Sequence, residues 1–238
     1  MTLQSTTQTQ PLGEFTDQQA TIPQPPLKND STPAVPPMNF TTRKKTRTGI
    51  ANDCKQLVAV VNDVSTSMTG EKARESDQAN QALHNELAAP ENKNGFILAN
   101  IHFNHTAITV VAPELATTAI LPPLTTGGGT SFDTALTQTL NMVTEFMSRE
   151  NPEGWDYLRP IVLFLSDGYS PVSQKNIDAL HEVADVIAIA YGADADESTL
   201  SCIASDGKVH RVGTNGHEFR AFLAQVGKTL SQKLATAR

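Results

Sequence analysis

The sequence is poor in cysteine, in long apolar runs and in the features of a secretory leader. Its 238 residues hold two cysteines, Cys54 and Cys202, and their spacing gives no support to a disulfide framework or a structural zinc site. No stretch of about 18 apolar residues is present that could span a membrane. The first residues, Met1–Ser5, lack a basic start and an apolar h-region. We therefore expect a cytoplasmic protein in a reducing compartment, without a membrane partner.

Periodic apolar residues are almost missing from residues 1–52, which instead hold seven of the 14 prolines and many Thr and Gln. Such a segment cannot bury enough surface to offset the entropy lost on ordering. We therefore expect a disordered tail at 1–52 and one compact domain at 53–238.

Basic residues are scarce in that domain. The tail carries five of the 18 basic residues and three of the 25 acidic ones, which leaves the domain 13 basic residues against 22 acidic. This balance argues against a nucleic-acid surface. The basic cluster at 43–47 could bind acidic surfaces or nucleic acid, but short basic runs at a tail junction are more often solvated.

The domain alternates short apolar runs with helical periodicity. Expected strands lie at 57–61, 96–103, 106–111, 161–165, 186–191 and 208–212, and expected helices at 71–89, 132–147, 177–184, around residue 200 and at 219–234. The second and third strands are separated by Asn104-His105, a spacing typical of a tight hairpin. The alternation predicts an α/β, three-layer, doubly wound fold, whose mostly parallel six-stranded sheet has one antiparallel edge strand.

Oxygen-bearing side chains gather in three segments that follow strands or loop breaks. These segments are Asp63-Val64-Ser65-Thr66-Ser67, then Gly127-Gly128-Gly129-Thr130-Ser131, then Leu165-Ser166-Asp167-Gly168. Loops at the carboxyl ends of strands lie on one edge of an α/β sheet, so we expect these segments to meet there. The predicted metal ligands are Asp63, Ser65, Ser67, Thr130 and Asp167. Hard oxygen ligands without His or Cys favour Mg²⁺, with Mn²⁺ or Ca²⁺ as alternatives.

These residues resemble the metal-ion-dependent adhesion site (MIDAS) of the von Willebrand factor type A (vWA) family, which combines Asp-x-Ser-x-Ser with a distant Thr and a distant Asp. The resemblance implies a Rossmann-like fold from about Leu57 to the last helix. It implies that Ser65, Ser67 and Thr130 bind the ion directly or nearly so, and that Asp63 and Asp167 bind it directly or through water. It also implies that an acidic residue of a partner protein completes the metal shell, so the expected role is binding and not catalysis.

Other interpretations of the same residues have less support. Ser65, Ser67 and Thr130 taken singly could cap helices or stabilise turns, and only their joint occurrence favours a metal. His102 and His105 could suggest zinc, but a strand end and a hairpin turn place them poorly and no third ligand is evident. The run of three glycines lacks the Gly-Lys-Ser/Thr ending of a phosphate loop.

The same segments also offer enzymatic alternatives. A metal-dependent hydrolase or phosphatase would use Asp63 as nucleophile, but aspartyl-phosphate chemistry needs a second acidic residue where this chain has Ser65. No Gly-x-Ser-x-Gly elbow is present, and no general base is evident beside the predicted site. A third alternative is a scaffold that makes its contacts through the N-terminal tail.

Within the resembled family, the chain is most similar to small cytoplasmic tellurium-resistance (TerY-like) bacterial members, because it shows no leader, membrane span or nucleotide-binding module. Those relatives are associated with stress responses, with Ser/Thr kinases and with PP2C-type phosphatases. The resemblance therefore predicts a metal-dependent protein-protein interaction module in bacterial stress, tellurite-resistance or kinase/phosphatase signalling, with the Thr-rich tail as a phosphorylation target.

Overall fold

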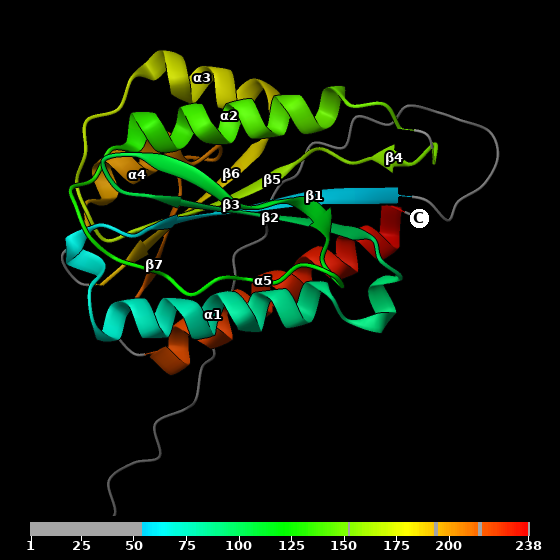
Figure 1. Cartoon of the computed structure of the whole chain (residues 1–238), viewed down its shortest axis with the longest axis horizontal. Coiled ribbons are helices and arrows are strands. Elements are labelled where there is room, and N and C mark those ends of the chain that lie inside the picture. The colour runs from blue at the N-terminus through cyan, green and yellow to red at the C-terminus, as the bar shows by residue number, and fades with distance from the viewer. Residues whose placement is uncertain (1–53, 152, 193–194, 214–215, 238) are drawn as a thin grey trace, which may run out of the picture. The chain divides into compact units, whose positions relative to one another are not determined.

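The computed structural model describes residues 54–151, 153–192, 195–213 and 216–237. In this part of the chain a central sheet lies between two layers of helices (Figure 1). The strands are β1 (Cys54–Asp63), β2 (Phe96–Phe103), β3 (Ala107–Leu115), β4 (Asp156–Tyr157), β5 (Ile161–Ser166), β6 (Asp185–Tyr191) and β7 (Val209–Val212). The helices are α1 (Glu71–Leu87), α2 (Phe132–Ser148), α3 (Gln174–Val183), α4 (Glu197–Ile203) and α5 (Gly216–Ala237), with short 3-10 turns η1 (Thr66–Met68) and η2 (Pro90–Asn92).

The strand order β3-β2-β1-β5-β6-β7 confirms the predicted fold class. β1, β2, β5, β6 and β7 run parallel to one another, and β3 pairs with β2 in the antiparallel sense at one edge. The two-residue strand β4 pairs with the start of β1 and was not predicted. It is too short to show a periodicity in the sequence.

The sheet buries both of its faces, which explains the uninterrupted apolar run in β1. Val58 and Val60 belong to the core under α1 and α5, whereas Leu57, Ala59 and Val61 belong to the core under α2, α3 and α4. Figure 1 shows these two helix layers on opposite sides of the sheet. Successive residues of a strand point to opposite faces, so a strand covered on both sides is apolar at every position.

Several strand boundaries differ from the expected ones. β1 begins at Cys54 and includes Lys55 and Gln56, whose amphipathic side chains are buried at its start. β3 continues to Leu115, beyond the predicted end at residue 111. The prediction ended early because most residues of this strand are half-buried or exposed and form no apolar run. None of the described helices combines the length and apolarity needed to cross a membrane. The expected tail at 1–52 and its basic cluster lie outside the described residues.

Candidate metal centre

The three predicted segments lie at the carboxyl edge of the sheet, where β1 and β5 end side by side. Asp63 is the last residue of β1, and Asp167 directly follows the last residue of β5. The register pairs Asn62 with Leu165, so the two strands end at the same level. Both aspartates are buried. Two carboxylates that are 104 positions apart in the sequence are thereby held in one place.

The two serines of the first segment join these carboxylates through hydrogen bonds. The Ser65 backbone N–H donates to Asp63 Oδ1 at 2.8 Å, and the Ser65 and Ser67 hydroxyl oxygens lie 2.9 Å apart. Ser67 Oγ donates to Asp167 Oδ1 at 2.7 Å. Ser65 is the N-cap of the 3-10 turn η1 and Ser67 lies within it, so both serines belong to the turn that follows β1.

Thr130 lies beside the Gly168 backbone. A Cβ atom at residue 168 would lie 3.3 Å from Thr130 Oγ1 and 3.6 Å from Asp63 Oδ2, so the absence of a side chain there lets the two oxygens approach. The structure therefore brings all five predicted ligands into one neighbourhood, contributed by three separate loops.

The glycine run binds the first loop through its backbone. Gly127 N–H donates to the carbonyl of Val64 at 2.7 Å, and the carbonyl of Gly128 accepts from both Thr66 N–H at 3.0 Å and Thr66 Oγ1 at 2.9 Å. Gly128 has a φ of +80°, which side chains on L-residues disfavour. A β-carbon at this position would also lie 2.5 Å from His105 Nδ1. The glycine is thus required both by the backbone angle and by the close approach.

The electrostatics of Asp63 favour a cation. Burial raises the pKa of its carboxyl group, hydrogen bonds from Ser166 and Ser65 act in the opposite direction, and the nearby negative charge of Asp167 raises the pKa further. A buried carboxylate is costly to ionise unless a positive charge compensates it. A donor set of two carboxylates and three hydroxyls is suited to a hard divalent cation, so the residues present fit such an ion.

Two residues without a predicted role also contact the candidate ligands. Ser166 Oγ donates to Asp63 Oδ2 at 2.5 Å and accepts from Gly168 N–H at 3.0 Å, so it fixes the first ligand from the neighbouring strand. The ammonium of Lys72 forms an ion pair with Asp167 Oδ2. Lys72 is the second residue of α1, where the helix dipole disfavours a cation, and that misplaced charge was a signal in the sequence.

Near the ligands, an aromatic cluster of Phe103, Phe132 and Phe164 joins the end of β2, the start of α2 and the strand β5. Ring centroids are 5.2 Å apart for Phe103 and Phe164, 5.3 Å for Phe132 and Phe164, and 6.0 Å for Phe103 and Phe132. All three rings are fully buried. Phe132 follows Thr130 by two positions and Phe164 precedes Asp167 by three, so packing of the rings positions the loops that carry these ligands.

The end of β1 is also held by a buried chain of amides. Asn80 of α1 donates through Nδ2 to Asn62 Oδ1 at 2.9 Å, and Asn62 donates through Nδ2 to Asn100 Oδ1 of β2 at 2.9 Å. These bonds fix the residue that precedes Asp63 from a helix and from a neighbouring strand.

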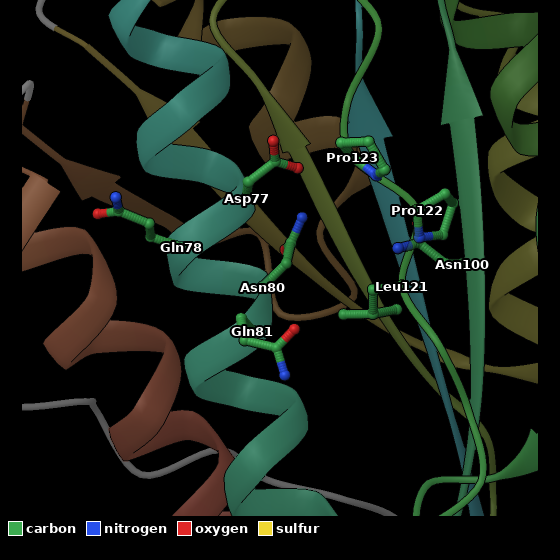
Figure 2. A pocket seen from close by; sticks show the side chains of 8 residues that line it. All are labelled: Asp77, Gln78, Asn80, Gln81, Asn100, Leu121, Pro122 and Pro123. Carbon is green, nitrogen blue, oxygen red and sulfur yellow. The ribbon is translucent and has the colours of Figure 1, made fainter.

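A separate groove of about 310 Å³ lies between α1 and residues 121–123 (Figure 2). Asp77, Asn80 and Asn100 contribute polar side chains to its lining, and Asp77 Oδ1 accepts from the Leu124 N–H at 2.9 Å. None of the five predicted metal ligands lines this groove. It is therefore distinct from the candidate metal centre.

The two histidines that could suggest a zinc site occupy different environments. His102 is buried in β2, whereas His105 is exposed in the turn that follows. Among the residues that the structure describes, no group of three His, Cys, Asp or Glu side chains is placed to hold a metal. The candidate centre has a different composition, because hydroxyl groups supply three of its five ligands.

No protein-family model matches this sequence. No curated protein matches it either.

Solved structures share the fold. The proximal thread matrix protein 1 of the mussel byssus, in a structure with a zinc-occupied MIDAS motif, is 19% identical with a TM-score of 0.53, and the match covers 77% of this chain and 48% of that one. A von Willebrand factor type A protein from Catenulispora acidiphila is 17% identical with a TM-score of 0.55, over 76% of this chain and 43% of the other. The pilus adhesin SpaC from Lactobacillus rhamnosus GG is 15% identical with a TM-score of 0.61, over 76% and 30%.

This chain thus spans less than half the length of these three structures. At such low identity, the likeness shows that the chain has the fold of vWA domains.

Proposed function

We propose that this domain is a vWA-type interaction module that holds a divalent metal ion and uses it to bind a carboxylate of a partner protein. The observation that carries the proposal is the convergence of hydroxyl and carboxylate oxygens at the carboxyl edge of the sheet, with Ser67 Oγ bonded to Asp167 Oδ1 and Ser65 Oγ. The zinc-occupied MIDAS motif of the byssus protein, which has the same fold, supports a metal at this position.

Among divalent ions we propose Mg²⁺ as the resident cofactor, with Mn²⁺ or Ca²⁺ as substitutes. The five ligands are all oxygen atoms, and only two of them carry charge, so the ion would keep water in its shell. When bound, the ion supplies a Lewis-acidic position that an anionic side chain can occupy. Asp63, Ser65, Ser67, Thr130 and Asp167 would hold it, and the glycine run and Ser166 would keep these residues in place.

Calorimetry with Mg²⁺ and Mn²⁺ tests the metal proposal. We expect binding to the wild type and its loss in Asp63→Asn and Thr130→Val. Asp178→Asn is the matched control, because it removes the same charge from an exposed position of α3. Ion concentrations of 100 times Kd should also raise the free energy of unfolding of the wild type by about 2.7 kcal/mol. Retained binding in both site variants would refute the assignment.

Peptide selection tests the partner proposal. A library of random displayed peptides would be captured on the protein in the presence of Mg²⁺ and eluted with EDTA. We expect the enriched peptides to contain an Asp or Glu, and we expect replacement of that residue by Asn or Gln to abolish binding. Capture that is insensitive to EDTA, and to Asp63→Asn, would instead support the scaffold alternative. In that case deletion of residues 1–52 should abolish capture.

We infer binding in preference to catalysis because the charged side chain that contacts the ligands is the ammonium of Lys72, which cannot take a proton from water. A metal-dependent phosphatase would instead hydrolyse p-nitrophenyl phosphate in the presence of Mn²⁺. We expect the wild type to hydrolyse this substrate no faster than Asp63→Asn does. A clearly higher rate in the wild type would favour the enzyme alternative.

The finer assignment is also a proposal, and it rests on the sequence resemblance. It places the protein among cytoplasmic, TerY-like bacterial members that act in stress or tellurite-resistance signalling with a Ser/Thr kinase or a PP2C-type phosphatase. Cell fractionation tests the location. EDTA-sensitive binding to a purified kinase or phosphatase from the same genome tests the partner.

A further inference from the structure

The groove between α1 and residues 121–123 has walls of two kinds (Figure 2). Residues 121–123 form an apolar wall, and polar side chains of α1 and β2 form the rest of the lining. In Figure 2 the side chains of Asp77 and Gln81 leave α1 on the side of residues 121–123, whereas Gln78 points the other way. The volume of about 310 Å³ is at the lower end for ligand pockets, so it suits a single side chain better than a cofactor.

Amide oxygens of the groove lack hydrogen-bond donors. Asn80 is 4% exposed, and its Nδ2 donates to Asn62, but its Oδ1 has no partner among the described residues. Gln81 is exposed and spends its amide nitrogen on two residues of its own helix, which leaves its Oε1 as an acceptor. A buried acceptor without a donor is costly, so the groove favours a ligand that donates several hydrogen bonds.

The charge of the groove is negative. Burial raises the pKa of the Asp77 carboxyl group, and a backbone hydrogen bond acts in the opposite direction. Asp77 forms no ion pair with the described residues. Arg74, one turn earlier, pairs with Glu71, and Arg220 of α5 donates to Gln78. None of the lining residues carries a positive charge, so the Asp77 carboxylate favours a cationic ligand.

A guanidinium group matches these walls. It is a planar cation with five N–H donors and no acceptor, and it is more weakly hydrated than an ammonium group. Its edge can serve the acceptors of α1 while a flat face lies against residues 121–123. A free amino acid would also bring an α-carboxylate, which no lining cation would meet and which Asp77 would repel. A side chain within a protein carries amides there instead.

We propose that this groove binds the guanidinium group of an arginine side chain from a partner protein. Asp77 pairs with the guanidinium, and the oxygens of Asn80 and Gln81 accept its other N–H groups. The domain's 22 acidic residues against 13 basic ones attract such a basic partner over a longer range. The site is separate from the candidate metal centre, so either proposal can fail without the other.

The test is a titration of the full chain, followed by ¹H–¹⁵N NMR, with Nα-acetyl-arginine N-methylamide at constant ionic strength. All samples contain EDTA, so the metal centre takes no part. We expect saturable shifts of backbone amides in α1 near Asp77 and at Leu124, which donates to Asp77. The citrulline counterpart has a neutral group of similar shape and should bind about tenfold more weakly, because it lacks the charge. The lysine counterpart should also bind more weakly.

Two pairs of variants locate the site. Asp77→Asn keeps an oxygen that can accept from Leu124 and should raise Kd about tenfold, whereas Asp178→Asn, at an exposed position of α3, should stay within about twofold. Gln81→Arg adds the chain's own guanidinium four residues after Asp77 and should abolish binding. Asn85→Arg adds the same charge one turn further, outside the lining, and should stay within about twofold. Gln81 is exposed, so this second pair decides if thermal melts show that Asp77→Asn does not fold.

The outcomes are distinct. Saturable shifts at the groove that weaken with citrulline and disappear in Gln81→Arg support the proposal. Shifts that do not saturate, that scatter over other acidic positions, or that persist in both groove variants overturn it. Equal affinity for the lysine counterpart overturns the choice of a guanidinium group. Binding of uncapped arginine tenfold tighter than the capped probe overturns the partner protein as its source.

Discussion

The buried histidine of β2 should make the stability of the domain depend on pH in a predictable direction. His102 is 7% exposed, and its Nε2 atom has no hydrogen-bond partner among the described residues. Burial lowers its pKa from 6.5 to about 4. The folded state therefore holds this imidazole neutral at pH values where the unfolded chain has already taken up a proton.

The direction of the pH dependence follows from this difference in the pKa of His102 between the folded and unfolded states. The unfolded state binds more protons between pH 6.5 and 4, so the free energy of unfolding falls as the pH drops through that window and is unaffected by His102 above it. Each unit of pKa difference corresponds to 1.36 kcal/mol, so going from pH 7 to pH 5 should remove about 2 kcal/mol. For a domain of this size, that loss lowers Tm by roughly 4–8 °C.

Urea unfolding at pH 7 and pH 5 measures the effect. The comparison of the two pH values within each protein cancels the direct effect of a substitution on stability. We expect His102→Gln to lose about 2 kcal/mol less than the wild type between the two pH values. His105→Gln, at an exposed position three residues away, should behave as the wild type does. Equal losses in wild type and His102→Gln would refute the reasoning.

Three further substitutions test one contact of a candidate ligand and two contacts of the core. Ser166→Ala removes the hydroxyl bonded to Asp63 and should weaken Mn²⁺ binding about tenfold by calorimetry, and an unchanged affinity would show that this hydroxyl does not orient the ligand. Asn62→Ala leaves two buried amides without their partner and should cost about 2–4 kcal/mol in urea unfolding, whereas a loss below 0.5 kcal/mol would mean that water replaces both bonds. Gly227→Ala places a Cβ 2.7 Å from Glu86 Cβ where α5 packs on α1, so Tm should fall with a loss of about 1–3 kcal/mol, and an unchanged Tm would contradict that close packing.

The order of elements could be predicted because local patterns carry it. The apolar run at Leu57–Val61 identified a strand covered on both faces, and the spacing of apolar residues identified α1 and α2 within a few positions. That the five candidate ligands lie close together was predictable for a related reason, although their binding of a metal stays a prediction. They lie at the end of β1 and in the turn after it, just before α2 and directly after β5, and the carboxyl ends of parallel strands share one edge.

Contacts between distant segments were not predictable in the same way. The bond from Ser166 to Asp63 depends on the register of β5 beside β1, and the ion pair of Lys72 depends on how η1 directs the start of α1. Neither the register nor the turn is encoded in the periodicity of one element. Antiparallel β3 was placed correctly but ended too early, because its half-exposed outer residues lack an apolar signal.

The aromatic cluster beneath the candidate centre divides the ligand loops into two classes. Phe132 and Phe164 pack against each other and against Phe103, so the loops of Thr130 and Asp167 cannot swing outwards without withdrawing a ring from its two neighbours. The segment that carries Asp63, Ser65 and Ser67 holds none of these rings. Opening of the site by loop motion would therefore cost least at the segment after β1, while Thr130 and Asp167 stay fixed to the core.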